Sequence, residues 1–128
     1  MDSATLQNKH TWGTSRHIVV TEKFDLAIAH GHAGGASSMH THQRKHNTFL
    51  VLTGEVEIVG ADGDSLAVLR PHESYTAKVG VPHRMVFITD ATLYEFYYPV
   101  DDNGGTIDLG DIQRLDRGWK PGEQLRED

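Results

Sequence analysis

The sequence predicts an all-β fold in which short antiparallel strands build a sandwich or a barrel. Runs rich in β-branched and aromatic residues recur along the chain, and glycine, proline and Asp-Gly pairs separate them. No apolar repeat with the period of a helix persists before Ile107. Many short strands with turn signals between them are typical of antiparallel sandwiches and barrels.

Each expected strand follows from a short apolar run. They lie at residues 17–21, 24–29, 48–59 (broken at Gly54), 65–69, 74–77, 83–88 and 91–98. The Asp62-Gly63 pair between two of these runs predicts a hairpin turn, because such pairs tolerate positive φ angles. Alternation along residues 48–59 places Phe49 and Val51 on one face, as barrel lining, and Leu50 and Leu52 on the other.

Composition limits the domain organisation and the classes of partner. A chain of 128 residues that is 38% hydrophobic predicts one domain, with an arm at 1–16, a core at about 17–100 and a tail at 101–128. With no cysteine, disulfides and thiolate metal sites are excluded. A formal net charge of −6 without a basic block argues against nucleic acid and anionic membranes.

The sequence also indicates where the protein works. Its N-terminus lacks the layout of a signal peptide, and no apolar run reaches membrane-spanning length. We therefore expect a soluble cytoplasmic protein.

Histidines are concentrated in one stretch. Five of the nine lie within the seventeen residues from His30 to His46. His40 and His42 are separated by one residue, so on a strand their imidazoles point to the same face, about 6–7 Å apart. Two such imidazoles suit a metal ion such as zinc, copper, iron or nickel. The alternative interpretation is a solvated histidine-rich loop.

The spacing of glycines and histidines resembles the two motifs of the cupin superfamily, in its small single-domain cupin 2 type. The first motif is matched by Gly34, His40-Thr41-His42, Asn47 and Gly54, and the second by Pro71-His72-Glu73 and Gly80-Val81-Pro82-His83. The resemblance implies a double-stranded β-helix, or jelly roll, with short irregular extensions at both ends. The sequence departs from the pattern where Asn47 replaces a glutamate, Lys78 or Val79 a proline and Phe87 an asparagine.

A weaker similarity extends to the sugar-phosphate isomerase-like cupins, including the type II mannose-6-phosphate isomerases. It is carried by Trp12-Gly13, by Ser38 and by the tail sequence from Asp111 to Asp116.

The cupin resemblance implies that His40, His42 and His83 bind one divalent metal ion, which we expect to be Zn, Fe, Mn or Ni. The fourth ligand is a carboxylate in the family, whereas Asn47 offers a neutral carbonyl oxygen. His46 is chemically the better ligand, but strict alternation prevents His46 and Asn47 from both facing inward. We favour His46 as the fourth ligand and Asn47 as a substrate contact.

Charged residues beside the histidines indicate an anionic small-molecule ligand. A site made of neutral imidazoles leaves the metal its full charge, which attracts an anion. Arg44 and Arg84 are the candidate clamps for it, and Lys45 is interpreted as a charged rim residue. Possible acid/base groups occur on the later strands, at Tyr75, Tyr94, Glu95, Tyr97 and Tyr98.

Two classes of function fit these residues. The first is a metal-dependent enzyme acting on a small polar or anionic substrate, such as a sugar or sugar-phosphate isomerase or epimerase. An iron-dependent dioxygenase is a further enzymatic alternative. The second class is a non-catalytic binding or sensing module. A buried base beside the metal would favour catalysis. The apolar outer face at Leu50 and Leu52 predicts a homodimer.

Overall fold

The computed structural model describes residues 7–100 and 106–123, which form strands and connecting loops. The strands are β1 (Gln7–His10), β2 (Gly13–Thr21), β3 (Phe24–Gly31), β4 (His40–Thr41), β5 (Lys45–Thr53), β6 (Val56–Val59), β7 (Ser65–Leu69), β8 (Ser74–Ala77), β9 (Arg84–Phe87), β10 (Ala91–Pro99) and β11 (Gln113–Arg114). Within these ranges no helix is long and apolar enough to cross a membrane.

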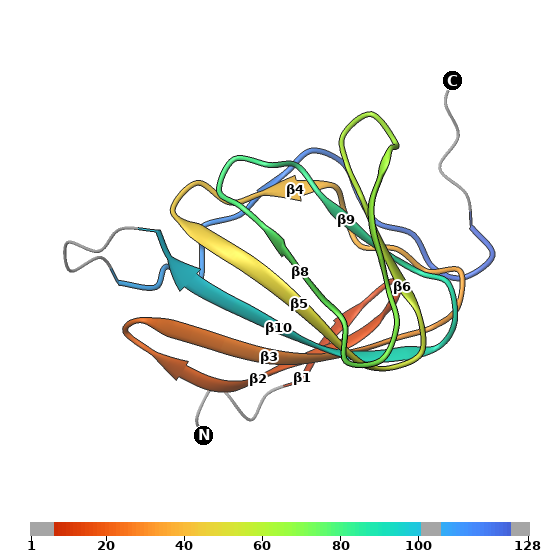
Figure 1. Cartoon of the computed structure of the whole chain (residues 1–128), viewed down its shortest axis with the longest axis horizontal. Coiled ribbons are helices and arrows are strands. Elements are labelled where there is room, and N and C mark those ends of the chain that lie inside the picture. The colour runs from red at the N-terminus through yellow and green to blue at the C-terminus, as the bar shows by residue number, and fades with distance from the viewer. Residues whose placement is uncertain (1–6, 101–105, 124–128) are drawn as a thin grey trace.

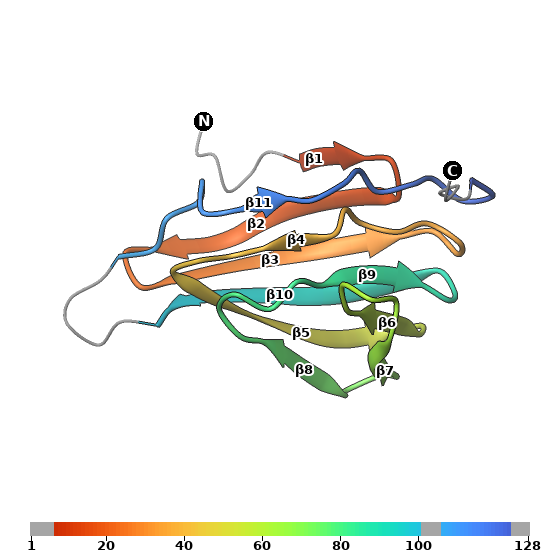
Figure 2. The ribbon, with the colours of Figure 1, turned by 90° about the horizontal axis from the view of Figure 1, so that it is seen from above.

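The strands form two facing layers (Figure 1). One layer is a six-stranded antiparallel sheet in the order β1-β2-β3-β10-β5-β8. The other contains the sheet β7-β6-β9 and the pair β11-β4, which a single antiparallel bridge between His40 and His83 joins together. Figure 2, turned by 90°, shows β4 and β11 running along the long strands of the first layer. The predicted all-β architecture is confirmed.

The expected strands match the observed ones closely. The main differences are the additional short strands β1, β4 and β11 and the greater length of β2, β3 and β5. The predicted N-terminal arm contains the edge strand β1 and the first residues of β2, while residues 1–6 lie outside the described part. β5 begins at Lys45, three residues before the expected start, and continues the alternation of the apolar run. The predicted tail is irregular in its described part except at β11, and residues 101–105 and 124–128 are outside that part.

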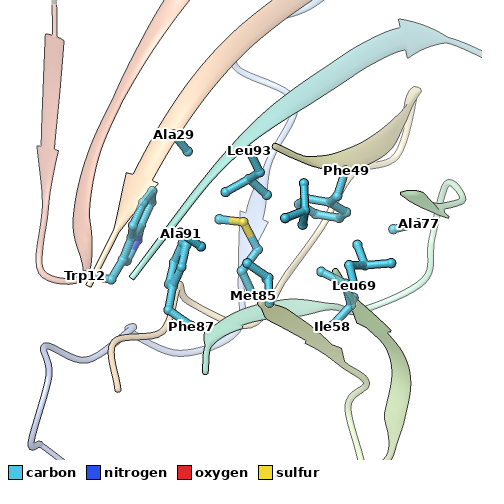
Figure 3. Close-up of a cluster of buried hydrophobic side chains, with 12 residues drawn as sticks. Trp12, Ala29, Phe49, Ile58, Leu69, Ala77, Met85, Phe87, Ala91 and Leu93 are labelled. Carbon is cyan, nitrogen blue, oxygen red and sulfur yellow. The ribbon is translucent and has the colours of Figure 1, made fainter. Parts of the chain in front are cut away.

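The apolar core fills the space between the layers (Figure 3). Phe49, Val51 and Leu93 face inward from the large sheet and are fully buried, as is Ile58 opposite them. Alternation puts these side chains on one face of each strand. Met85 extends between the two sets, confirming its predicted place in the lining. Close packing of this kind contributes most of the favourable free energy of folding.

Small residues on the inner face of β3 let the two layers approach each other. A Cβ atom on Gly31 would lie 2.1 Å from the Phe87 ring, so only glycine allows this contact. Trp12, 6% exposed, stacks on the other side of Phe87 with the ring centroids 5.2 Å apart. The end of the sandwich at the β1–β2 turn is therefore closed by aromatic packing.

Towards the opposite end, the inward-facing residues change from apolar to polar. On β10 the order is Leu93, Glu95, Tyr97, and the register places Glu95 opposite Phe49 of β5 and Tyr97 opposite Asn47. The neighbouring strand β3 likewise changes to Asp25, which is opposite Tyr97. These polar side chains surround a cavity instead of filling the core.

Candidate metal centre and its cavity

Three histidines from two neighbouring segments meet at the polar end. His40 lies on β4 and His42 follows directly after it, while His83 precedes β9 and is bridged to His40 through mutual backbone hydrogen bonds of 3.0 Å. One ring nitrogen from each residue lies within 4.8 Å of the others. This triangle is compact enough for one metal ion to bind all three.

Backbone carbonyl groups fix the orientation of each imidazole. The Nδ1 atoms of His40, His42 and His83 lie 2.8, 2.7 and 2.9 Å from the carbonyl oxygens of Ser38, Asp111 and Val81, respectively. Because a carbonyl oxygen only accepts hydrogen bonds, each Nδ1 donates, and the lone pair of each neutral ring is on Nε2. This arrangement orients imidazoles for metal binding.

The local environment keeps the three rings neutral. Burial lowers the pKa of His40 to about 2, and its neighbours His83 and His42 lower it further. Burial likewise lowers the pKa of His42 to about 4, against the opposing effect of the Asp111 carbonyl. Burial also lowers the pKa of His83. Neutral imidazole is the form that binds metal ions.

The residues present fit a divalent metal. The Nε2 atoms of His42 and His83 are buried and have no hydrogen-bond partner among the described residues. An unpaired buried nitrogen is costly unless something occupies the position it faces. Three neutral nitrogen ligands with further coordination positions open are typical of catalytic metal sites.

His46 lies on the outer side of β5. Its Nδ1 accepts a hydrogen bond from the Val79 backbone N–H at 3.1 Å, and its ring packs near that of Tyr98. The ligand group formed by the three other histidines does not include it. The side chains alternate without interruption from Phe49 back to Lys45, which places His46 on the outer side. We had favoured His46 as the fourth ligand, but the structure places it away from the other three histidines.

Asn47 faces inward and is fully buried. Neither of its side-chain polar atoms has a partner within the described residues, although it is opposite Tyr97 in the β5–β10 ladder. It is not one of the cavity-lining residues.

The two arginines expected to clamp an anion are engaged elsewhere. Arg44 is exposed and paired with Asp108. Arg84 is buried, where it donates to the Ser37 carbonyl, pairs with Asp116 and stacks over Trp119. Neither lines the cavity beside the histidines. Both arginines attach the tail to the barrel, a role that residue type and spacing do not reveal.

A cavity of about 500 Å³ opens next to the metal centre and is lined by His40, His42, Glu95 and Tyr97 among others. This volume lies within the range of small-molecule sites. The Tyr97 hydroxyl donates to Oε1 of Glu95 at 3.1 Å, and the Tyr97 ring contacts His42 edge-on, with centroids 5.4 Å apart. A titratable carboxyl group is thereby placed on the same cavity as two of the three histidines.

The pKa of Glu95 is strongly perturbed. Burial raises it from 4.5 to about 7, against the smaller opposing effect of the Tyr97 hydrogen bond, and the charge of Asp25 raises it further. Burial together with Glu95 raises the pKa of Tyr97 well above 10, so the phenol stays protonated. Near neutral pH, Glu95 therefore exchanges a proton readily, and the Tyr97 hydroxyl keeps the proton that it donates to Glu95.

Lys45 is part of the cavity wall and is 5% exposed, which corrects its interpretation as a rim residue. Its Nζ donates to the Asp108 carbonyl at 3.0 Å and lies 4.6 Å from the centroid of the Tyr97 ring. Burial lowers its pKa, and nearby carboxylates oppose that effect. The same wall contains Asp25, 1% exposed and paired with His17 at 2.7 Å.

Sequence reasoning missed part of this wall. Asp25 and His17 were not predicted as site residues, and Arg114 entered only as part of the tail sequence from Asp111 to Asp116. Glu95 and Tyr97 were two of five possible acid/base groups. A single acidic residue within an otherwise apolar or aromatic strand, as at Asp25 and Glu95, was the available signal. It could not show which face of the strand is buried.

Comparison with known proteins identifies the family. Residues 28–97 match the cupin domain. The chain belongs to the cupin family. No match was found among curated proteins.

Solved structures show the same fold. A protein with a double-stranded β-helix domain from Klebsiella pneumoniae superimposes with a TM-score of 0.69 at 17% identity, covering 88% of this chain and 86% of that one. KdgF from a Halomonas species gives 0.66 at 16% identity, covering 80% and 95%. Oxalate decarboxylase from Bacillus subtilis gives 0.67 at 16% identity, covering 88% of this chain and 30% of its own. The expected double-stranded β-helix is confirmed.

Proposed function

We propose that this cupin is a metal-dependent enzyme that transfers a proton on a small polar substrate, as a sugar isomerase or epimerase does. The observation that carries the proposal is Glu95, a fully buried carboxyl group with a pKa of about 7 on the same cavity as His40 and His42. A group whose pKa lies near the working pH is suited to general acid/base catalysis.

His40, His42 and His83 would hold the ion, which we expect to be Zn, Fe, Mn or Ni. When bound, a divalent metal supplies a Lewis acid that polarises a carbonyl or hydroxyl oxygen. The ligands contribute no charge of their own, so the site favours substrates with electron-rich oxygens.

The proton transfer itself is assigned to the protein side chains. As a carboxylate, Glu95 accepts a proton from the carbon next to a substrate carbonyl. As an acid it returns that proton to the former carbonyl carbon, while the proton of the adjacent substrate hydroxyl group passes to the carbonyl oxygen. The Tyr97 hydroxyl, which donates to Oε1, holds the carboxyl group in place. Lys45, with its ammonium group beside the Tyr97 ring, contributes positive charge to the same wall.

Proton exchange with solvent tests the proposal. The metal-loaded protein is incubated in D₂O with a panel of aldoses, ketoses and their phosphates, and deuterium incorporation next to the carbonyl group is followed by proton NMR. Wild-type protein should incorporate deuterium into at least one compound. Glu95→Gln should abolish incorporation but keep its metal, whereas Glu57→Gln on β6 should behave as wild type. Undiminished incorporation by Glu95→Gln contradicts the role of Glu95.

A non-catalytic sugar or organic-acid binding module is the second candidate. Asn47 favours it, because this residue stands where the cupin motif has a carboxylate and is buried without a hydrogen-bond partner in the described chain. Binding of a panel compound without any proton exchange would support this candidate.

The homodimer and the cytoplasmic location stay predictions. The half-buried Leu50 and Leu52 on the outer face of β5 support the homodimer.

A further inference from the structure

Arg114 lies beside the metal centre although it is far from the histidines in sequence. It is on β11, and its Cα is paired directly with that of His40 on β4. Directly opposed residues of an antiparallel pair extend from the same face, with their Cβ atoms about 4.5–5.5 Å apart. Because His40 faces the cavity, Arg114 faces it as well, and it is one of the residues that line it.

The tail holds the backbone of Arg114 on both sides. Asp111 accepts hydrogen bonds from the backbone N–H groups of Gln43 and Arg44. On the other side, the Leu115 N–H donates to the Met39 carbonyl at 2.7 Å, and Asp116 accepts from the Met39 N–H at 2.8 Å. The backbone at Arg114 is therefore held at the edge of the cavity, which its exposed side chain helps to line.

The charge of Arg114 has no counter-ion among the described residues. Three other arginines of this region are paired: Arg44 with Asp108, Arg84 with Asp116 and Arg117 with Glu123. The nearby Asp111 uses its carboxylate for backbone N–H groups, and Asp25 is across the cavity with His17. After burial, the positive charge of Arg114 is the second cause of the lowered pKa of His10, another cavity-lining residue.

We propose that Arg114 is the anion-binding residue of the cavity and holds an oxyanion group, carboxylate or phosphate, of the substrate. The guanidinium group offers a planar pair of donors that matches either oxyanion. Since Arg114 is opposite His40 and lines the same cavity, an oxyanion bound to it shares that cavity with two of the proposed metal ligands, His40 and His42. The substrate class is thus a small polyhydroxy or carbonyl compound with one acidic end.

This inference rests on the proposed function, which makes the cavity the substrate site. Its test measures binding at equilibrium and does not require catalysis. Binding of D-glucuronate, D-glucose 6-phosphate and D-glucose to the Zn²⁺-loaded full chain is measured by calorimetry. The three sugars share one ring and differ in the group at the sixth carbon, which is a carboxylate, a phosphate or a hydroxymethyl group. At least one of the anions should bind more tightly than glucose, and the tighter one identifies the oxyanion.

The variants separate the role of Arg114 from net charge. Arg114→Gln should weaken the preferred anion about tenfold or more, to the level of glucose, because a charge-assisted bidentate contact is lost. Arg114→Lys should keep part of the affinity. Arg16→Gln removes the same charge from the exposed outer side of β2, outside the cavity lining, and should leave binding unchanged.

Four results overturn the inference: equal affinity for the three sugars, no binding of either anion, equal anion affinity in wild type and Arg114→Gln, or an equal loss in Arg16→Gln. The proposed function fails on a different result. Anion binding that depends on Arg114 but comes without proton exchange contradicts the enzymatic assignment and leaves this inference standing.

Discussion

The raised pKa of Glu95 makes the stability of the native state depend on pH in a predictable direction. In the unfolded chain this carboxyl group titrates near 4.5, and in the folded protein near 7. The native state therefore favours the protonated form, and the stability linked to this proton is complete below pH 4.5 and lost as the pH rises through 7. Glu95→Gln, which cannot ionise, should not show this loss.

The size of the effect follows from the two pKa values. Each pKa unit corresponds to about 1.4 kcal/mol of free energy. The pKa of Glu95 rises from 4.5 to about 7 on folding. Between pH 4 and pH 9, the free energy of unfolding of wild type should therefore fall by about 3 kcal/mol relative to that of Glu95→Gln. Glu95 is only 6% exposed, so solvent screening reduces this value little.

Urea denaturation of the metal-free protein between pH 4 and pH 9 measures the effect. The difference in free energy of unfolding between wild type and Glu95→Gln is plotted against pH, which cancels the titration of the three histidines common to both. Glu57→Gln, on the outer side of β6, provides the matched control and should give a flat difference. A flat difference for Glu95→Gln as well would refute the reasoning.

Further predictions concern the metal centre, the tail and the core. His40→Ala combined with His42→Ala should abolish metal retention in elemental analysis while the β-sheet circular dichroism persists, and His46→Ala should keep its metal; the reverse pattern would reject the three-histidine site. Removing the metal with a chelator should lower Tm, because a ligand that binds only the native state stabilises it, and an unchanged Tm would count against a resident ion. Asp111→Ala should lower the free energy of unfolding by about 1–3 kcal/mol, because the backbone N–H groups of Gln43 and Arg44 lose their acceptor; denaturation unchanged from wild type would contradict this. Leu93→Ala, at a fully buried position, should cost about 2–5 kcal/mol in the same assay and the outer-face Leu52→Ala clearly less, so equal costs would show that the faces of the strands are misassigned.

The strands and the His40–His42 pair could be predicted from sequence because both signals are local. Alternation within residues 48–52 shows which side chains share a face, and the HxH spacing places His40 and His42 together. These features need only the geometry of one strand or one turn. His83 has no such local signal and came from the second motif of the family resemblance.

The remainder of the site depends on pairings between distant segments. Whether Glu95 faces the cavity or the solvent is decided by its partners Ala27 and Phe49, which lie far away in sequence. His46 was favoured on chemical grounds, but the β5–β10 pairing is regular from Lys45 to Val51, so no bulge turns His46 inward. Arg114 belongs to a two-residue strand, which is too short to carry a periodic signal.

The hydrogen bond from His42 Nδ1 to the Asp111 carbonyl means that the barrel alone does not complete the metal centre. The carbonyl groups that orient His40 and His83 belong to their own loops, whereas the one that orients His42 comes from a segment 69 residues later in the chain. The segment between Asp111 and Asp116 therefore connects metal affinity to the docking of the tail. Substitutions there can change the strength of metal binding and the recognition of the ligand together, while the β-sandwich that carries the site keeps its packing.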